Sequence, residues 1–201
     1  VHPGFYEAFA SVQAEIQEAL DHHKSCPFYI TGHSLGGALA VVATRYLNHP
    51  KSAATYTFGG PRVADERFFA DFCTPVYRVV NGADAVARLP FGEWFTLILA
   101  LIRLIPLNGT FKIAEWLRNA IAGYTHTGDS IYLSDASNTL PNADGISYGD
   151  LIVMHDPEFV WRTRLTLTRF LRGGFQAFVS DHDISIYANK LHAHAQRCQA
   201  S

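Results

Sequence analysis

The sequence predicts an α/β fold in which helices flank a mostly parallel sheet. Short apolar runs rich in β-branched and aromatic residues alternate along the chain with longer segments of helical periodicity. The connections between them are short, a pattern typical of parallel strands joined by crossover helices. The chain has 201 residues, of which 48% are hydrophobic and 17% are charged. This length and composition predict one folded domain over residues 1–201.

Each predicted element is an apolar pattern bounded by turn residues. The predicted strands cover residues 28–31, 54–58, 76–80 and 130–133. The predicted helices cover residues 5–24, 38–47, 65–72, 159–171 and 184–196, and Asp65 is a candidate N-cap. Residues 91–123 break the alternation and are predicted to form a helical insertion. Their apolar run contains Arg103 and Pro106 and is shorter than the roughly 20 residues that cross a bilayer, so we expect no transmembrane helix.

Charge and cysteine content exclude several classes of function. Sixteen Lys and Arg against eighteen Asp and Glu give a formal net charge of -2, with no basic block of the kind that binds nucleic acid. Cys26, Cys73 and Cys198 are far apart, so they form neither a disulfide scaffold nor a C-x-x-C metal pair. One intramolecular disulfide is compatible with them, and the sequence does not assign it. We therefore expect no nucleic-acid partner and no metal.

A G-x-S-x-G motif, Gly32-His33-Ser34-Leu35-Gly36, lies between the first predicted strand and a helix. In that context the serine occupies a tight turn that lifts its hydroxyl above the sheet. We expect side chains at positions 32 and 36 to collide with the crossing strand and helix, so that glycine is needed at both. The N-terminus of the following helix favours an oxyanion nearby. Ser34 is the candidate nucleophile, and the alternative interpretation is an ordinary glycine-rich turn.

A serine hydroxyl needs a base, and the base needs a group that orients it. In this context an acid follows the serine along the chain, and a histidine follows the acid. Asp84 comes after the third predicted strand, at the carboxyl end where sites of open α/β sheets form. Asp135 is an alternative because it follows the next strand, whereas Asp129 precedes that strand. The other interpretation of Asp84 is a turn residue bonded to its own backbone.

Histidines after Asp84 are the candidates for the base, and they are His126, His155, His182, His192 and His194. His192 and His194 lie on the terminal helix pattern and are interpreted as surface residues. His155 stands just before a predicted helix and is interpreted as a capping or packing residue. His182 lies in a polar turn late in the chain, where a loop-borne base is expected. The alternative interpretation of His182 is a solvated loop residue.

Further motifs occur in a fixed order along most of the chain, at residues 1–5, 31–38, 56–63, 77–84, 88–90, 124–128 and 181–182, the last with Tyr187 a turn later. Taken together they resemble the class 3 lipases, the α/β-hydrolase family that includes the fungal triacylglycerol lipases. The resemblance implies an α/β-hydrolase fold with Ser34 as nucleophile, Asp84 as acid and His182 as base. It also implies structural roles for His126 and His33. The backbone N–H of Leu35, the residue after the nucleophile, is the expected oxyanion donor.

The resemblance implies a serine carboxylester hydrolase that acts on acylglycerols or related lipid esters without a cofactor. The same residues would serve a phospholipase, an acyltransferase or a thioesterase. An inactive lipase-like protein that binds a membrane or a partner is the alternative outside enzymes. Aromatic and aliphatic residues in 91–123 are expected to form a lid or cap, or to contact a lipid interface. A secreted and a membrane-peripheral location both fit these expectations.

The chain begins at Val1, directly on a helical pattern, without an initial Met or a signal-peptide pattern. The family that it resembles places part of its oxyanion hole and its usual lid upstream of the segment matched by residues 1–5. We therefore expect the natural protein to be longer, with further strands before Val1. Among those residues we expect a Ser or Thr that supplies a second oxyanion donor.

Overall fold

The computed structural model describes residues 1–23, 25–88, 123–135 and 151–200. In these residues the core is a five-stranded sheet in the order β1-β2-β3-β4-β5, with β1 to β4 parallel and β5 antiparallel to β4. The strands are β1 (Phe28–His33), β2 (Ser52–Phe58), β3 (Val76–Asn81), β4 (Asp129–Asp135) and β5 (Leu151–His155). The predicted fold class is confirmed. The strand β5 is an addition, because its short apolar run carries no clear alternation.

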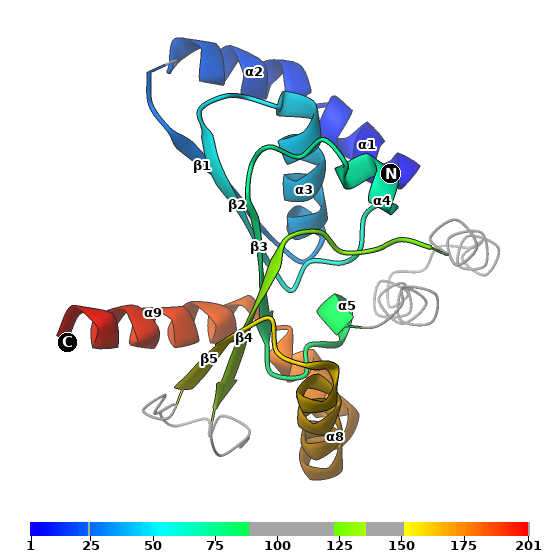
Figure 1. The fold of residues 1–201 in the computed structure, drawn as a ribbon, viewed down its shortest axis with the longest axis vertical. Coiled ribbons are helices and arrows are strands. Elements are labelled where there is room, and N and C mark those ends of the chain that lie inside the picture. Colours follow the sequence, from blue (N-terminus) through cyan, green and yellow to red (C-terminus); the bar gives the residue numbers. More distant parts are fainter. Residues whose placement is uncertain (24, 89–122, 136–150, 201) are drawn as a thin grey trace, which may run out of the picture.

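The helices of the described residues flank this sheet. They are α1 (Pro3–Ala10), α2 (Gln13–His22), α3 (Leu35–Leu47), α4 (Glu66–Phe69), α5 (Ala85–Arg88), α8 (Phe159–Asp181) and α9 (Ile184–Ala200). The carboxylate of Asp65 accepts a hydrogen bond from the Phe68 N–H, so the predicted N-cap of α4 is confirmed. Figure 1 places α2 and α8 at opposite ends of the molecule.

The helix expected over residues 5–24 is two helices in the structure, so this prediction was wrong. The chain breaks at Ser11 and Val12, where the Ser11 hydroxyl donates to the Ala8 carbonyl and the Val12 N–H donates to the Phe9 carbonyl. In α1 the side chains of Phe5 and Phe9 are buried, whereas α2 buries none of its residues. The apolar spacing stays in phase across the break, and periodicity therefore does not reveal it.

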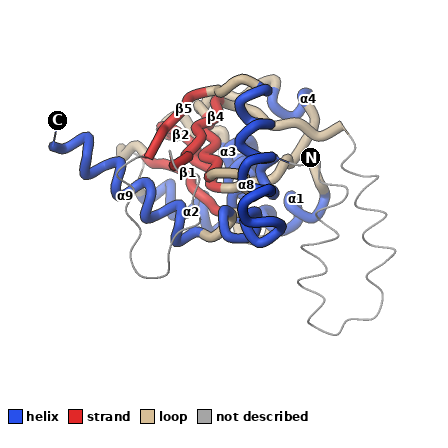
Figure 2. The backbone as a smooth tube through the Cα atoms, turned by 90° about the horizontal axis from the view of Figure 1, so that it is seen from below, coloured by secondary structure: helices blue, strands red, loops and turns tan. Residues whose placement is uncertain are grey.

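The sheet has a packed layer on each face. On β3 the neighbouring residues Val79 and Val80 point to opposite faces, since Val79 packs with Tyr187 of α9 and Val80 packs with Tyr132 and, at its edge, Trp161 of α8. Figure 2 shows the same division, with α9 on one side of the sheet and α3 and α8 on the other. Because helices cover both faces, the carboxyl ends of the parallel strands are the edge left for a site.

The helix α8 runs past the end predicted for it and contains a kink. At Gly174 the backbone angles are φ 56 and ψ -148, which break the helical path. The segments on the two sides of the kink pack together through Phe170 and Phe178, whose stacked rings have centroids 5.9 Å apart. The second segment ends at Asp181 and leads directly into His182, which is the C-cap of the helix.

The helical insertion expected over residues 91–123 lies, apart from residue 123, outside the described residues. None of the described helices has the length and apolar character needed to cross a bilayer. Cys26, Cys73 and Cys198 are exposed, and no disulfide bond joins them.

Candidate active site

Ser34 lies at the turn between β1 and α3 in an uncommon backbone conformation. Its φ is 53 and its ψ is -122, a region that residues other than glycine rarely occupy. The Ser34 N–H donates to the Phe58 carbonyl at 2.9 Å, and the Ser34 carbonyl accepts from the N–H of Gly37 at 3.0 Å. The predicted strand-turn-helix context is therefore confirmed, and backbone hydrogen bonds to β2 and α3 hold the strained turn.

The two glycines of the motif have different roles. A Cβ on Gly32 would overlap the backbone of Gly36, so glycine is required at position 32 as expected. A Cβ on Gly36 would meet nothing within 4 Å, and the expectation for that position was wrong. The reason is that the backbone of Gly36 is itself the group that passes over Gly32. The second crowded position is Gly37, where a Cβ would lie 3.1 Å from the Cα of Gly60.

The structure brings Ser34, His182 and Asp84 together in one hydrogen-bonded chain. The Ser34 hydroxyl donates to His182 Nε2 at 2.9 Å. On the other side of the ring, His182 Nδ1–H lies 3.0 Å from both carboxylate oxygens of Asp84. Asp84 is fully buried, whereas the His182 side chain keeps part of its surface in solvent. The three groups come from the ends of β1, β3 and α8, at the edge where a site was expected.

Two further donors hold the Asp84 carboxylate. The Tyr187 hydroxyl donates to Oδ2 at 2.6 Å, and the Val86 N–H donates to Oδ1 at 2.9 Å. The same hydroxyl accepts a hydrogen bond from the Asn81 N–H at 3.0 Å. Burial, reinforced by the charge of Asp84, raises the pKa of Tyr187 well above its ordinary value, so the phenol keeps the proton that it donates. The local turn contact of Asp84 thus exists alongside its contact with His182.

Gly59, just after β2, makes room for the contact between Asp84 and His182. Its φ is 58, and a Cβ there would lie 3.1 Å from both His182 Nδ1 and the Tyr187 hydroxyl, and closer still to Asp84. A side chain at this position would therefore displace the groups that orient the histidine. This role of Gly59 was not predicted from the sequence. Its only signal was a pair of glycines at a strand end.

A buried ion pair fastens the turn that carries Asp84. The Arg169 guanidinium donates two hydrogen bonds to the Asp181 carboxylate, and both side chains are almost completely buried. Asp181 Oδ2 also accepts from the Ala83 N–H at 2.6 Å. Gly82, with φ 48, leaves the space that this carboxylate fills. The two segments of α8 and the end of β3 therefore meet at one carboxylate, directly beside His182.

Asn81 connects the same turn to both terminal helices. Its side-chain N–H donates to the Asp181 carbonyl at 2.9 Å, and its side-chain oxygen accepts from Lys190 Nζ at 2.8 Å. All of these groups are buried. Arg169, Asp181 and Lys190 were not predicted as parts of the site. Asp181 carried one usable signal, its position next to His182, whereas nothing in the helical pattern distinguished the other two.

Two other histidines have structural contacts. His33 Nε2–H donates to the backbone carbonyl of His182 at 2.9 Å, and burial lowers the pKa of His33. His126 Nε2–H donates to the Ala87 carbonyl at 3.0 Å, and burial together with the charge of Arg78 lowers its pKa to about 3. Both rings therefore stay neutral near pH 7, and each holds backbone that borders the site. These contacts agree with the structural roles that the resemblance implied.

The remaining candidates lie elsewhere in the fold. His155 ends β5, and His192 and His194 lie on α9. Asp129 and Asp135 are the first and last residues of β4. Among the described residues no group of His, Cys, Asp and Glu side chains is arranged to hold a metal ion.

Leu35 is the first residue of α3 and directly follows Ser34, the candidate nucleophile. Its N–H belongs to the first turn of a helix and has no intrahelical acceptor. The positive end of the helix dipole favours negative charge at the same point. This position suits a donor to an oxyanion that forms on a substrate bonded to Ser34.

A serine on a strained strand-to-helix turn, with a histidine and a buried aspartate at the carboxyl ends of a mostly parallel sheet, defines an α/β-hydrolase fold. Residues 1–94 match the family model described as lipase (class 3). The chain is 46% identical over 127 residues to secreted mono- and diacylglycerol lipase 1 of Fusarium solani, an alignment that covers 57% of this chain and 38% of that protein. Over residues 1–94 the chain is therefore similar to the class 3 lipases.

Two further comparisons involve Rhizomucor miehei. The chain is 38% identical over 104 residues to a lipase of that fungus, covering 45% of this chain and 28% of the lipase. The solved structure of the Rhizomucor miehei lipase propeptide complex aligns at 27% identity and a TM-score of 0.47, covering 68% of this chain and 39% of that one. The chain thus spans well under half of the length of these relatives.

Proposed function

We propose that this protein is a serine carboxylester hydrolase that cleaves acylglycerols or related lipid esters. The observation that carries the proposal is the hydrogen-bonded chain from Ser34 Oγ through His182 to the buried Asp84. A nucleophile, a base and an orienting acid in this order are the groups that acyl transfer through a serine requires. Ser34 stands on a turn whose strain directs its hydroxyl away from the sheet.

In the acylation step, Ser34 Oγ attacks the ester carbonyl carbon as its proton passes to His182 Nε2. The carbonyl oxygen becomes an oxyanion that accepts a hydrogen bond from the Leu35 N–H. When the carbon–oxygen bond to the leaving alcohol breaks, the alcohol oxygen takes the proton from His182. The products of this half-reaction are the free alcohol and an acyl group esterified to Ser34.

In the deacylation step, water attacks the acyl carbon and gives a proton to His182 Nε2. The tetrahedral intermediate then expels Ser34 Oγ, which recovers the proton from the histidine. Throughout both steps Asp84 accepts the Nδ1–H bond, which fixes the tautomer and stabilises the imidazolium. The Tyr187 and Val86 donors support this role, because they leave the carboxylate little freedom to rotate.

Two observations support a lipid ester as substrate. The family is named for lipase activity, and the Fusarium solani relative is named as a mono- and diacylglycerol lipase. Exposed apolar side chains occur close to the reacting groups along the chain, namely Leu35 directly after Ser34, and Val179 and Ile184 a few residues before and after His182. Exposed apolar groups around the nucleophile favour an acyl chain over a polar substrate.

The experiment that tests the proposal replaces the nucleophile. Ser34→Ala is expected to lower kcat for p-nitrophenyl butyrate by about 10⁴-fold or more, with an unchanged circular dichroism spectrum. A fluorophosphonate probe is expected to label the wild-type protein and not this variant. Ser25→Ala, which changes an exposed serine, is the matched control and keeps both activity and labelling. A wild-type protein that neither hydrolyses esters nor takes the label would contradict the proposal and favour the inactive alternative.

A second assay, with emulsified lipids as substrates, identifies the lipid class. Triacylglycerol, diacylglycerol and phospholipid substrates of equal acyl length are compared in one emulsion, and release of fatty acid is followed by titration. Release from acylglycerols in excess of phospholipid is expected. Preferential release from phospholipid would reassign the substrate without changing the roles of Ser34, His182 and Asp84.

A further inference from the structure

The outward side of α8 is apolar. Five large apolar side chains on the segment of this helix before its kink are exposed, from 50% of the Phe170 surface to 74% of the Leu171 surface. We call them the α8 apolar face, and they are Phe159, Val160, Leu167, Phe170 and Leu171. Their spacing places them on one side of the helix, whereas Leu165 and Arg169 on the opposite side are buried. A surface helix ordinarily presents polar residues on its outer side.

The charges within residues 159–180 of this helix have one sign. Residues 159–180 contain four arginines and no aspartate or glutamate, and the nearest acidic residue before them is Glu158. Arg164 is exposed and borders the apolar face, whereas Arg169 is used in the buried pair with Asp181. An apolar helix side bordered by arginine is the pattern of helices that lie in the interface of a membrane. The arginines complement anionic headgroups, and the apolar side chains complement acyl chains.

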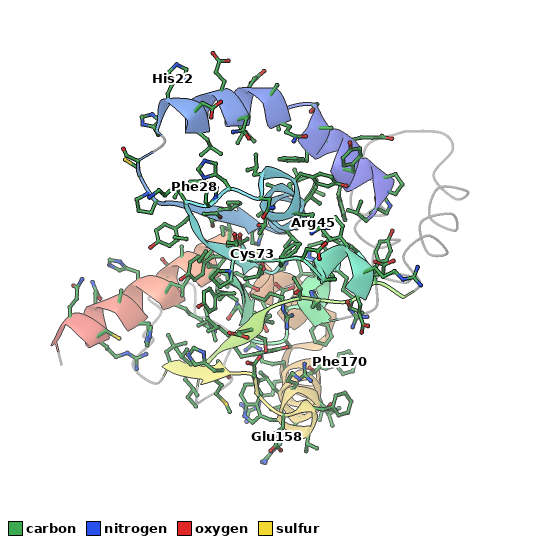
Figure 3. The ribbon with its side chains drawn as sticks, turned by 45° about the horizontal axis from the view of Figure 1, so that its top comes forward. His22, Phe28, Arg45, Cys73, Glu158 and Phe170 are labelled. Atoms are coloured by element: carbon green, nitrogen blue, oxygen red, sulfur yellow. The ribbon has the colours of Figure 1, made fainter. Side chains whose placement is uncertain are left out.

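The α8 apolar face lies close to the candidate active site. The helix packs beside α5, which directly follows Asp84, and it ends at His182. Figure 3 shows Glu158 and Phe170 at the end of the molecule away from His22. The C-terminal end of the helix therefore lies at the carboxyl edge of the sheet, where its C-cap His182 contacts Ser34.

We propose that the α8 apolar face docks the protein onto an anionic lipid surface and presents Ser34 to esters held in it. The choice of lipid as the occupant rests on the proposed function. The charges support that choice over a second copy of the chain, because a two-fold contact through this face would bring like-charged arginine borders together. They also support it over a protein of mixed surface charge, since residues 159–180 offer no carboxylate to such a partner.

The first test measures binding without catalysis. Protein carrying Ser34→Ala is mixed with vesicles of phosphatidylcholine alone or with phosphatidylglycerol added, and the bound fraction is measured by flotation. Leu167→Ser with Leu171→Ser is expected to weaken binding to the anionic vesicles on the order of a hundredfold, because two exposed leucines no longer enter the acyl region. Val12→Ser, an exposed apolar position between α1 and α2, is the control and leaves binding unchanged.

The second test concerns charge. Arg164→Gln is expected to weaken binding to phosphatidylglycerol vesicles roughly fivefold, and to leave the weaker binding to phosphatidylcholine unchanged. Arg67→Gln, at an exposed arginine of α4, is the matched control without effect. Added salt is expected to reduce the difference between wild type and Arg164→Gln, since the contribution of an exposed charge is screened.

Several results would overturn the inference. One is equal vesicle binding by wild type and the double leucine variant. A marked fall in its melting temperature would show that other residues of the protein cover the face, and a wild-type dimer that the variant dissociates would assign the face to a second copy. The proposed function fails separately, through absent hydrolysis of soluble esters by wild type. If the docking inference and the proposed function both hold, the double leucine variant made in the active protein should lose more hydrolysis of esters held in vesicles than of soluble esters.

Discussion

Ser34 and Asp84 follow strands β1 and β3 of the same sheet. Different kinds of interaction hold the two residues in place. Around Ser34 the backbone is decisive: the turn has a strained φ, its N–H and carbonyl bond to other backbone groups, and no side chain caps α3. Around Asp84 the side chains are decisive, because Tyr187 bonds to the carboxylate and Asp181 bonds to the turn that carries it. The candidate nucleophile is positioned by chain geometry, and the candidate acid by buried polar contacts.

The difference follows from where each residue comes in the chain. Ser34 lies between a strand and a helix that are adjacent in sequence, so local conformation can place its hydroxyl. Asp84 and His182 are separated by 98 residues, and no local rule fixes one against the other. Arg169, Asp181 and Asn81 supply directional bonds across that separation. Such buried polar groups are stable only when each has a partner, which makes the arrangement specific.

The largest effect is expected at the backbone-controlled turn. Gly32→Ala forces a Cβ into the backbone of Gly36, and it should lower the free energy of unfolding by about 4 kcal/mol or more and abolish fluorophosphonate labelling of Ser34. Gly36→Ala is the matched control. It meets open space and should be neutral or stabilising by about 0.5 kcal/mol. Urea unfolding and probe labelling measure both, and equal effects of the two substitutions would contradict backbone control of the turn.

The second effect concerns the buried pair. Arg169→Met leaves the Asp181 carboxylate buried without its cation, and it should lower the free energy of unfolding by about 3–5 kcal/mol. The exposed pair of Arg45 and Asp71, 2.8 Å apart, offers the control. Arg45→Met should lower stability by about 1 kcal/mol or less. Urea midpoints compare the two, and a loss for Arg169→Met no greater than for Arg45→Met would disprove the importance of the buried contacts.

The third and smallest effect concerns the hydrogen bond from the neutral His126 ring to the Ala87 carbonyl, in contrast to the charged pair of Arg169 and Asp181. The pKa of His126 is lowered from 6.5 to about 3 in the folded chain, so between these values the unfolded chain binds a proton that the folded chain does not. Stability should therefore fall as the pH falls through this range, by about 3 kcal/mol at a pH of about 4. His126→Gln keeps an N–H donor for the Ala87 carbonyl and removes this contribution.

The measurement is urea unfolding of wild type and His126→Gln across that pH range. The difference between the two stability curves isolates the histidine, because the carboxyl groups that also titrate are common to both proteins. Parallel curves would show that His126 is protonated in the folded chain. The Ala87 contact would then have to be charged rather than neutral.

Local patterns account for what could be predicted. Four of the strands, the N-cap Asp65 and the turn at Ser34 were predicted because each depends on residues within a few positions of one another. The break between α1 and α2 was missed because its apolar spacing stays in phase. The roles of Gly59 and Arg169 were missed for a different reason. Each is defined by a contact with residues that only the folded chain brings near.

The sequence by itself determined the fold class and the identity of the reacting candidates, since periodicity, glycine positions and the order of Ser34, Asp84 and His182 can be read from neighbouring residues. The tertiary structure decided how these groups meet. The 2.9 Å contact between Ser34 and His182 joins residues 148 positions apart, and the surrounding polar contacts come from α8 and α9. Local rules specify conformation, but only packing sets the distance between side chains that are remote in the chain.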